Sequence, residues 1–268
     1  MSERVVVITG ASSGIGAELA KQLGARGDSL VLAARGEEAL REVAASIDTR
    51  THVVRTDVTV RGDVERLRDE AIAAFGRVDV WVNNAGRGIN QPVLELTEQD
   101  IDEMMTVNVK SALYGMQAIV PHFQERGRGQ IVNVSSFLGR VPLATVRSAY
   151  NAAKAALNAL TANLRVDLAA QWPDIHVTLV MPGVVMTPFA ANALNAPPEP
   201  PVARPAGMQP QTVEEATARI VEVIDHPRAE IYTNPASPEL ARRYYADIEA
   251  FEAEARRAFQ AAAATPPS

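Results

Sequence analysis

Short apolar runs alternate along this chain with longer segments whose apolar residues recur at helical spacing, and this alternation limits the possible folds more than any other feature. The runs are rich in β-branched residues and predict strands at residues 4–9, 30–34, 52–56, 78–83, 130–135, 175–181 and 230–233. They are nearly continuous in apolar residues, as expected for a parallel sheet that helices cover on both faces. The sequence therefore predicts an α/β fold with a doubly wound, seven-stranded parallel sheet.

Two regions depart from this rhythm. Seven prolines fall between residues 187 and 211. Proline at that density excludes a helix interior and a central strand, which predicts a long lid loop at about 187–211, with a disordered surface excursion as the alternative. Beyond residue 237, apolar residues recur every three or four positions, at Leu240, Tyr244, Ile248, Phe251, Ala255 and Phe259. This spacing predicts a helix at about 238–263 whose apolar face docks on the same subunit or on a neighbour.

Composition argues against several function classes. A formal net charge of −6 argues against a nucleic-acid partner, which requires a basic surface. The chain has no cysteine, which excludes disulfides and thiolate zinc sites, and the four histidines lack zinc-ligand spacing, so we expect no metal site (His52, His122, His176 and His226). No apolar run is long enough for a signal peptide or a membrane span. We therefore expect a cytoplasmic protein without a membrane partner.

A glycine-rich turn follows the first predicted strand directly. Residues 9–16 read TGASSGIG, and a helical pattern begins at once. Glycine lets a backbone turn tightly and approach a pyrophosphate, and the following helix start offers free N–H groups. The spacing Gly-x-x-x-Gly-x-Gly differs from the common fingerprint Gly-x-Gly-x-x-Gly. We expect a dinucleotide-binding and catalytic domain over residues 1–237 and a helical C-terminal extension over residues 238–268.

Tyr150 and Lys154 lie four residues apart in a long helical pattern, which brings both side chains to one helix face. The unperturbed pKa of a phenol is about 10, so tyrosine is a poor acid/base at neutral pH without help. A nearby ammonium group favours the phenolate and lowers that pKa. The pair is therefore a candidate proton donor and acceptor, although such a pair in isolation is more often a solvated feature of a helix surface.

Four motifs in order resemble the shorter, single-domain branch of the short-chain dehydrogenase/reductase family. They are residues 9–16 (TGxxxGxG), residues 83–86 (NNAG), Tyr150-x-x-x-Lys154, and Pro182-Gly183. The resemblance spans residues 4–233 and implies a Rossmann-like fold. It also implies hydride transfer between a nicotinamide cofactor and a carbonyl or secondary alcohol, with Tyr150 as acid/base and Lys154 bonded to the nicotinamide ribose.

The same resemblance assigns further roles. Matching the motif Ser-x-x-Gly selects Ser136 as the residue that orients the substrate oxygen. Ser136 is 14 positions before Tyr150, one more than the family spacing, so we expect an inserted residue after Gly139. Because of this difference, Ser135 stays as the alternative. Asn108 matches the asparagine that bends a helix and holds a water near the lysine. The implied cofactor-binding residues are Gly10, Ser12, Ser13, Gly14, Ile15, Gly16, Arg35, Asp57, Val58, Asn84, Ala85, Gly86, Tyr150, Lys154, Pro182, Gly183, Val185 and Thr187.

Cofactor preference is expected to depend on the end of the second strand. NAD-binding sites usually place a carboxylate there, which repels a 2′-phosphate, but here Ala34 takes that position and Arg35 follows. A guanidinium can pair with phosphate or stack on adenine. We therefore expect NADP(H) to be preferred and NAD(H) to be accepted; the alternative is that Arg35 is only a solvated residue that opens the next helix.

Apolar residues in the expected substrate region favour a lipophilic or mid-sized ketone or alcohol (Phe137, Leu138, Val184, Val185, Phe189 and Leu194). The resemblance also implies a homodimer or homotetramer. Two rival functions remain at this point. One is a regulator that senses the dinucleotide without chemistry, and the other is an epimerase or dehydratase from the longer branch of the same superfamily.

Overall fold

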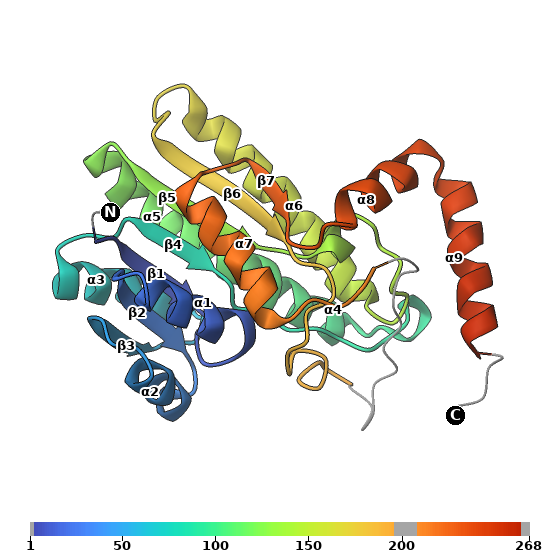
Figure 1. The fold of residues 1–268 in the computed structure, drawn as a ribbon, viewed down its shortest axis with the longest axis horizontal. Coiled ribbons are helices and arrows are strands. Elements are labelled where there is room, and N and C mark those ends of the chain that lie inside the picture. Colours follow the sequence, from blue (N-terminus) through green and yellow to red (C-terminus); the bar gives the residue numbers. More distant parts are fainter. Residues whose placement is uncertain (1–2, 196–207, 264–268) are drawn as a thin grey trace.

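The computed structural model describes residues 3–195 and 208–263, and its centre is a seven-stranded parallel sheet (Figure 1). The strand order is β3-β2-β1-β4-β5-β6-β7. The strands are β1 (Val5–Thr9), β2 (Ser29–Ala34), β3 (Thr51–Arg55), β4 (Val80–Asn83), β5 (Gly129–Val134), β6 (Ile175–Met181) and β7 (Glu230–Tyr232). The predicted fold class is confirmed, and the predicted strands are correct to within two residues at each end.

Helices cover both faces of this sheet and explain the continuous apolar strands. The helices are α1 (Gly14–Gly24), α2 (Glu37–Ala45), α3 (Arg61–Phe75), α4 (Glu98–Met105), α5 (Ser111–Arg126), α6 (Ser148–Ala169), α7 (Val213–Asp225), α8 (Ser237–Ala246) and α9 (Ile248–Ala263). Leu19 of α1, Leu40 of α2 and Ile220 of α7 pack in the core on one face. On the other face, α3, α5 and α6 supply Leu67, Phe123 and Leu168. In the described part of the chain no helix is long and apolar enough to cross a membrane.

The C-terminal extension contains two helices, so the prediction of one helix at 238–263 is wrong. The chain is extended at Asp247 (φ −157°, ψ 93°) between α8 and α9. The Asp247 carboxylate accepts a hydrogen bond from the Ala250 backbone N–H at 2.9 Å, which caps the start of α9 and favours the break. Leu240 and Tyr244 of α8, with Phe251 of α9, pack beside Phe137 on the same chain.

Both described ends of the predicted lid loop are attached to the body. At the first end, the Leu194 N–H donates to the Gly88 carbonyl at 2.9 Å and the Asn90 N–H donates to the Leu194 carbonyl at 2.8 Å. At the other end, the Gln211 N–H donates to the Val184 carbonyl at 2.8 Å. Residues 196–207 of the predicted loop lie outside the described residues.

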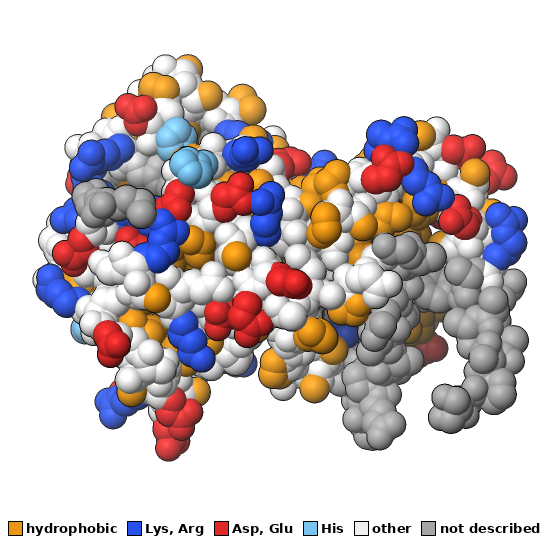
Figure 2. Space-filling view, in the orientation of Figure 1, with side chains coloured by type: hydrophobic (Ala, Val, Ile, Leu, Met, Phe, Trp, Pro, Cys, Tyr) orange, Lys and Arg blue, Asp and Glu red, His pale blue; other side chains and the backbone are white. Residues whose placement is uncertain are grey.

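On the face of the molecule shown in Figure 2, basic and acidic side chains are interspersed.

Candidate functional site

A cleft of about 1260 Å³ lies at the carboxyl ends of the strands, where ligands bind in open α/β sheets. Its walls come from the loops after β1, β2, β3, β4, β5 and β6, from the start of α6, and from residues 182–193. It exceeds the roughly 300–1,000 Å³ of a pocket for one drug-sized ligand. A dinucleotide and a small substrate can therefore share it.

The glycine turn forms one end of this cleft. Gly10 and Gly14 have positive φ values of 66° and 53°. A Cβ on Gly16 would lie 2.2 Å from the Gly10 carbonyl oxygen and 2.6 Å from the Asn84 amide nitrogen, so only glycine fits there. The turn exposes backbone at the amino end of α1, next to the cleft-lining residues Ser12, Ser13 and Ile15. These features fit a dinucleotide pyrophosphate.

Asn84 joins the glycine turn to the end of β4. Its side-chain amide donates to the Thr9 carbonyl at 2.9 Å and to the Gly10 carbonyl at 3.3 Å. In the opposite direction, the Thr9 hydroxyl oxygen accepts from the Asn84 and Ala85 backbone N–H groups at 3.0 and 3.2 Å. The first two motifs thus hold each other in place.

The far end of the cleft contains Ala34, Arg35, Asp57 and Val58. Arg35 is exposed, and its guanidinium has no hydrogen bond or ion pair with any residue that the structure describes. The Asp57 carboxylate accepts from the Thr59 N–H at 3.0 Å and from the Thr59 hydroxyl at 2.7 Å, which closes the turn after β3. No carboxylate stands at position 34, so this end of the cleft has room for a 2′-phosphate next to Arg35.

The two candidate serines have different partners. The Ser135 hydroxyl bonds to the Asn158 side-chain oxygen at 2.6 Å and to the Lys154 carbonyl at 3.3 Å, both in α6. The Ser136 hydroxyl accepts the Leu138 N–H at 3.1 Å and is hydrogen-bonded to the Tyr150 side chain. A Cβ on Gly139 would lie 2.7 Å from the Lys154 backbone, so this glycine allows the loop after β5 to reach α6. The geometry favours Ser136 as the serine that meets a substrate.

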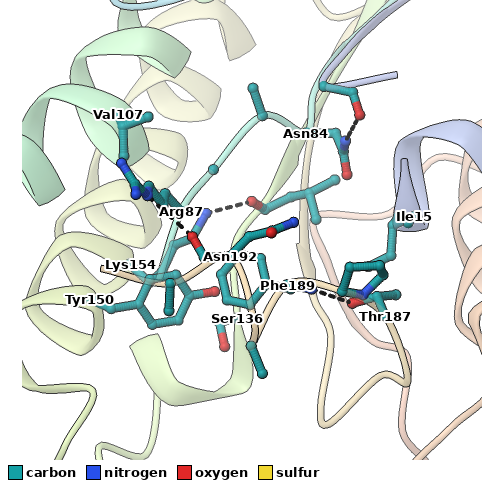
Figure 3. A pocket seen from close by; sticks show the side chains of 18 of the residues that line it. Ile15, Asn84, Arg87, Val107, Ser136, Tyr150, Lys154, Thr187, Phe189 and Asn192 are labelled. Atoms are coloured by element: carbon teal, nitrogen blue, oxygen red, sulfur yellow. Dashed lines mark hydrogen bonds between the residues drawn. The ribbon is translucent and has the colours of Figure 1, made fainter. Parts of the chain in front are cut away.

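Tyr150 is buried in the cleft wall, where its ring packs against Phe189 (Figure 3). Burial raises the pKa of its phenol to about 12, while the hydrogen bond to Ser136 and the Arg147 charge act in the opposite direction. In Figure 3, Ser136, Tyr150 and Lys154 lie on one side of the cleft, and Ile15 and Thr187 lie across from them.

Lys154 is also buried, and burial lowers the pKa of its ammonium group to about 7. Its Nζ donates to the Val134 carbonyl at 3.0 Å and lies 5.6 Å from the centroid of the Tyr150 ring. The expectation that Lys154 lowers the pKa of Tyr150 is therefore wrong for the protein's own groups. Burial removes water from both side chains, and it is the largest cause of both pKa shifts.

Asn108 lies in a π-helical turn, Thr106–Lys110, between α4 and α5. Its amide nitrogen donates to the Arg87 carbonyl at 2.9 Å and its side-chain oxygen accepts from the Arg87 N–H at 3.2 Å. A Cβ on Gly86 would lie 2.9 Å from that oxygen and 3.4 Å from the Lys154 nitrogen. Asn108 therefore fixes the loop after Asn84-Ala85-Gly86 beside the lysine; its role in holding a water stays a prediction.

The last group of predicted residues follows β6. Pro182, Gly183, Val185 and Thr187 all line the cleft. The Thr187 side chain lies 3.5 Å from the position of a Cβ on Gly14, so it faces the glycine turn across the cleft. All the predicted catalytic residues line the same cleft except Asn108, and all the predicted cofactor-binding residues line it except Gly16.

The polar residues of the cleft that the sequence did not predict include Arg87, Asn90 and Arg147. Arg87 directly follows the NNAG motif and Arg147 is three residues before Tyr150, so proximity to the motifs was the only available signal. The histidines lie elsewhere; His122, for example, accepts the Val78 N–H at 3.1 Å. Among residues 3–195 and 208–263, no three histidine, aspartate or glutamate side chains are grouped to hold a metal ion.

Comparison with known proteins shows which family the chain resembles. The family model for short chain dehydrogenase matches residues 4–197. An uncharacterized oxidoreductase of Staphylococcus epidermidis is 38% identical over 189 residues, which are 70% of this chain and 81% of that protein. The uncharacterized oxidoreductase YxnA of Bacillus subtilis is 34% identical over 246 residues, which are 90% of this chain and 68% of that protein.

Solved structures agree with this assignment. A short-chain dehydrogenase/reductase from Burkholderia phymatum in complex with NAD superposes with a TM-score of 0.83 at 29% identity, covering 92% of this chain and 95% of that chain. An alcohol dehydrogenase from the archaeon Thermococcus sibiricus complexed with 5-hydroxy-NADP gives a TM-score of 0.76 at 25% identity, covering 88% and 98%. The resemblance predicted from the motifs is confirmed: the chain belongs to the short-chain dehydrogenase/reductase family of oxidoreductases.

Proposed function

We propose that this protein catalyses reversible hydride transfer between NADP(H) and a ketone or secondary alcohol, with Tyr150 as the acid/base. The observation that carries the proposal is that Ser136, Tyr150 and Lys154 meet in a cleft that also contains the glycine turn. A regulator that only sensed the dinucleotide would need neither Ser136 nor a proton donor at Tyr150. The solved relatives named above were complexed with NAD and with 5-hydroxy-NADP, which supports a nicotinamide cofactor here as well.

When bound, the nicotinamide cofactor supplies or accepts the hydride. The residues that would hold it are the glycine turn for the pyrophosphate, Asp57 and Val58 for the adenine, and Lys154 for the nicotinamide ribose. Arg35 supports a preference for NADP(H), because its exposed guanidinium is available to a 2′-phosphate.

In the reductive direction, Ser136 orients the substrate carbonyl and Tyr150 donates its hydroxyl proton to the oxygen that becomes the alcohol. Ser136 is suited to this role because its hydroxyl lines the cleft and is hydrogen-bonded to the Tyr150 side chain, so both groups reach the same oxygen of a substrate. The phenol of Tyr150 is protonated at neutral pH, which is the form that reduction requires, and burial raises its pKa to about 12, which makes it a weaker acid among the protein's own groups. Lys154 and Asn108 return the proton from solvent.

The substrate we propose is a mid-sized compound with an apolar portion. Apolar side chains line the cleft near Ser136 and Tyr150, and they favour contact with an apolar part of a substrate. They belong to Leu138, Val146, Val184 and Phe189. This wall also includes alanines at positions 190, 191 and 193.

The test is to follow NADPH absorbance with a panel of aliphatic and aromatic ketones, comparing the wild type with Tyr150→Phe. We expect turnover by the wild type and a loss of about 10²–10⁴-fold in Tyr150→Phe, with unchanged NADPH binding, since only the proton donor is removed. NADPH binding without turnover of any ketone or alcohol would support the regulator instead.

A further inference from the structure

Three arginines line the cleft: Arg35 beside Ala34, and Arg87 and Arg147 nearer to Tyr150. Arg87 has a carboxylate partner, whereas Arg147 has none among the described residues. Arg87 is paired: its Nη1 lies 2.8 Å from the Glu103 carboxylate, and its Nε donates to the Asn192 carbonyl at 3.2 Å. The Arg147 guanidinium donates to the Ile89 carbonyl at 3.3 Å and to no other residue that the structure describes. No carboxylate in the described part of the chain lies within ion-pair distance of Arg147. A guanidinium has five N–H donors, so most of those on Arg147 are unused by the described residues.

Arg147 lies directly beside the reacting groups. It precedes α6 and is three residues before Tyr150, whose pKa its charge lowers. Its Nη1 is 2.6 Å from the position of a Cβ on Gly88, and the Phe189 ring is 3.0 Å from the same position. The guanidinium, Gly88 and Phe189 therefore meet at the wall that covers Tyr150.

The charge on Arg147 is unfavourable as it stands. The side chain is partly buried, and burial lowers the pKa of its guanidinium. It also stands at the amino end of the 22-residue helix α6, where the helix dipole repels a cation. A buried cation without a counterion destabilises the fold, so an uncompensated one in a ligand cleft indicates that the ligand supplies the negative charge.

A second unused donor lies in the segment that Arg147 contacts. The Asn90 side-chain nitrogen is buried and has no hydrogen-bond partner among the described residues. Asn90 also lines the cleft, and it directly follows Ile89, the residue whose carbonyl Arg147 contacts. A carboxylate accepts hydrogen bonds from both groups at once, whereas a neutral apolar substrate satisfies neither.

We propose that Arg147 and Asn90 bind a carboxylate of the substrate. The physiological substrate is then an oxo acid or hydroxy acid with an apolar chain between its carboxylate and its oxo or hydroxyl group. This inference rests on the proposed function for the position of the reacting carbonyl. It assigns Arg147 to substrate specificity rather than to proton transfer.

The experiment compares oxo acids of five to eight carbons with their methyl esters, which lack the negative charge and carry one additional methyl group. For the wild type, we expect kcat/KM to favour the acid over its ester by about tenfold or more for the chain length that spans Tyr150 and Arg147. In Arg147→Met this preference should disappear through a higher KM for the acid, while the ester is little affected. Arg147→Gln serves the same comparison if Arg147→Met does not fold.

Arg87→Met is the matched control, because that arginine is already neutralised by Glu103 and its loss should change acid and ester by the same factor. Equal turnover of acid and ester by the wild type overturns the inference. So does an equal loss for both in Arg147→Met, which would indicate an effect on Tyr150 alone.

A binding measurement separates this inference from the proposed function. Calorimetric titration of the NADPH-loaded protein with hexanoate and hexanamide should give binding of hexanoate only, and Arg147→Met should abolish it. If hexanoate binds in this way but no oxo acid or ketone is reduced, the proposed function fails and the carboxylate site stands. If ketones are reduced but hexanoate binding does not depend on Arg147, the carboxylate site fails and the function stands.

Discussion

The ring of Phe189 lies against the ring of Tyr150, with 5.6 Å between the centroids and 58° between the planes. Phe189 belongs to the described beginning of the predicted lid loop, and it remains 36% exposed. One side of its ring therefore covers the tyrosine and the other faces solvent. This contact links the loop after β6 directly to the group that we propose as the proton donor.

Phe189→Ala should lower kcat/KM for apolar ketones by about tenfold, mainly through KM, because the ring is part of the substrate wall. The melting temperature should change little, since a partly exposed ring contributes little to the core. Steady-state kinetics and thermal melting test this directly. Met186→Ala is the control, because Met186 is nearby in the chain and 60% exposed. An unchanged KM in Phe189→Ala, or an equal rise in Met186→Ala, would contradict the assignment.

The two serine variants should differ in what they lose: Ser136→Ala should lose turnover, and Ser135→Ala should lose stability. Removing the Ser136 hydroxyl takes away a donor to the reacting oxygen, and we expect turnover to fall by about 10²-fold with little change in stability. Removing the Ser135 hydroxyl leaves the Asn158 oxygen without its 2.6 Å partner, at a cost of about 1–3 kcal/mol in the free energy of unfolding. Urea denaturation beside kinetics separates the two effects. A larger loss of turnover in Ser135→Ala would reverse the assignment.

Lys154→Met should stabilise the protein at neutral pH while it lowers turnover. The pKa of Lys154 is about 7 in the folded protein, against an ordinary value of 10.5. The unfolded chain therefore binds more protons between these pH values, and the stability of the wild type rises with pH across this window. Methionine has no charge to bury, so the free energy of unfolding of Lys154→Met should exceed that of the wild type by at least about 1 kcal/mol near pH 7. This difference should shrink toward pH 10.

Urea denaturation of both proteins between pH 6.5 and pH 9.5 measures this difference. Lys110→Met is a suitable control, because it makes the same substitution at an exposed lysine. A stability gap between wild type and Lys154→Met that is constant over this range would show that Lys154 keeps an ordinary pKa.

Arg35→Ala should weaken NADPH binding by roughly 1.5–3 kcal/mol, the range for hydrogen bonds to charged groups, and should barely change NADH binding. The physical reason is that only NADPH carries the 2′-phosphate that the guanidinium can pair with. Fluorescence titration with both cofactors measures the two affinities. Equal weakening of both, or a wild type that binds NADH as tightly as NADPH, would remove Arg35 from this role without affecting the oxidoreductase assignment.

The sequence predicted those features that depend on local pattern. The strand Ile175–Met181 was predicted with the bounds that the structure shows, because all its residues except His176 are buried and the apolar run ends abruptly. The meeting of Ser136 and Tyr150 followed from motifs whose spacing reflects one fold. These are properties that a short stretch of sequence carries by itself.

Features that depend on partners distant in the chain could not be predicted. The break at Asp247 interrupts an apolar pattern that continues unchanged across it. The pKa of Lys154 is set by burial under loops that close only in three dimensions. Arg147 is one of many arginines in the sequence, and only the folded chain reveals that no described carboxylate faces it.

The strand order has an evolutionary consequence. The loops after β1, β2 and β3 carry the glycine turn, Arg35 and Asp57, whereas the loop after β5 and the start of α6 carry Ser136, Arg147 and Tyr150. Under the roles that we propose for Arg35 and Arg147, coenzyme choice and substrate choice are encoded in separate stretches of the gene. Selection can alter one without disturbing the other, so a lineage can acquire a new substrate while it inherits its coenzyme unchanged.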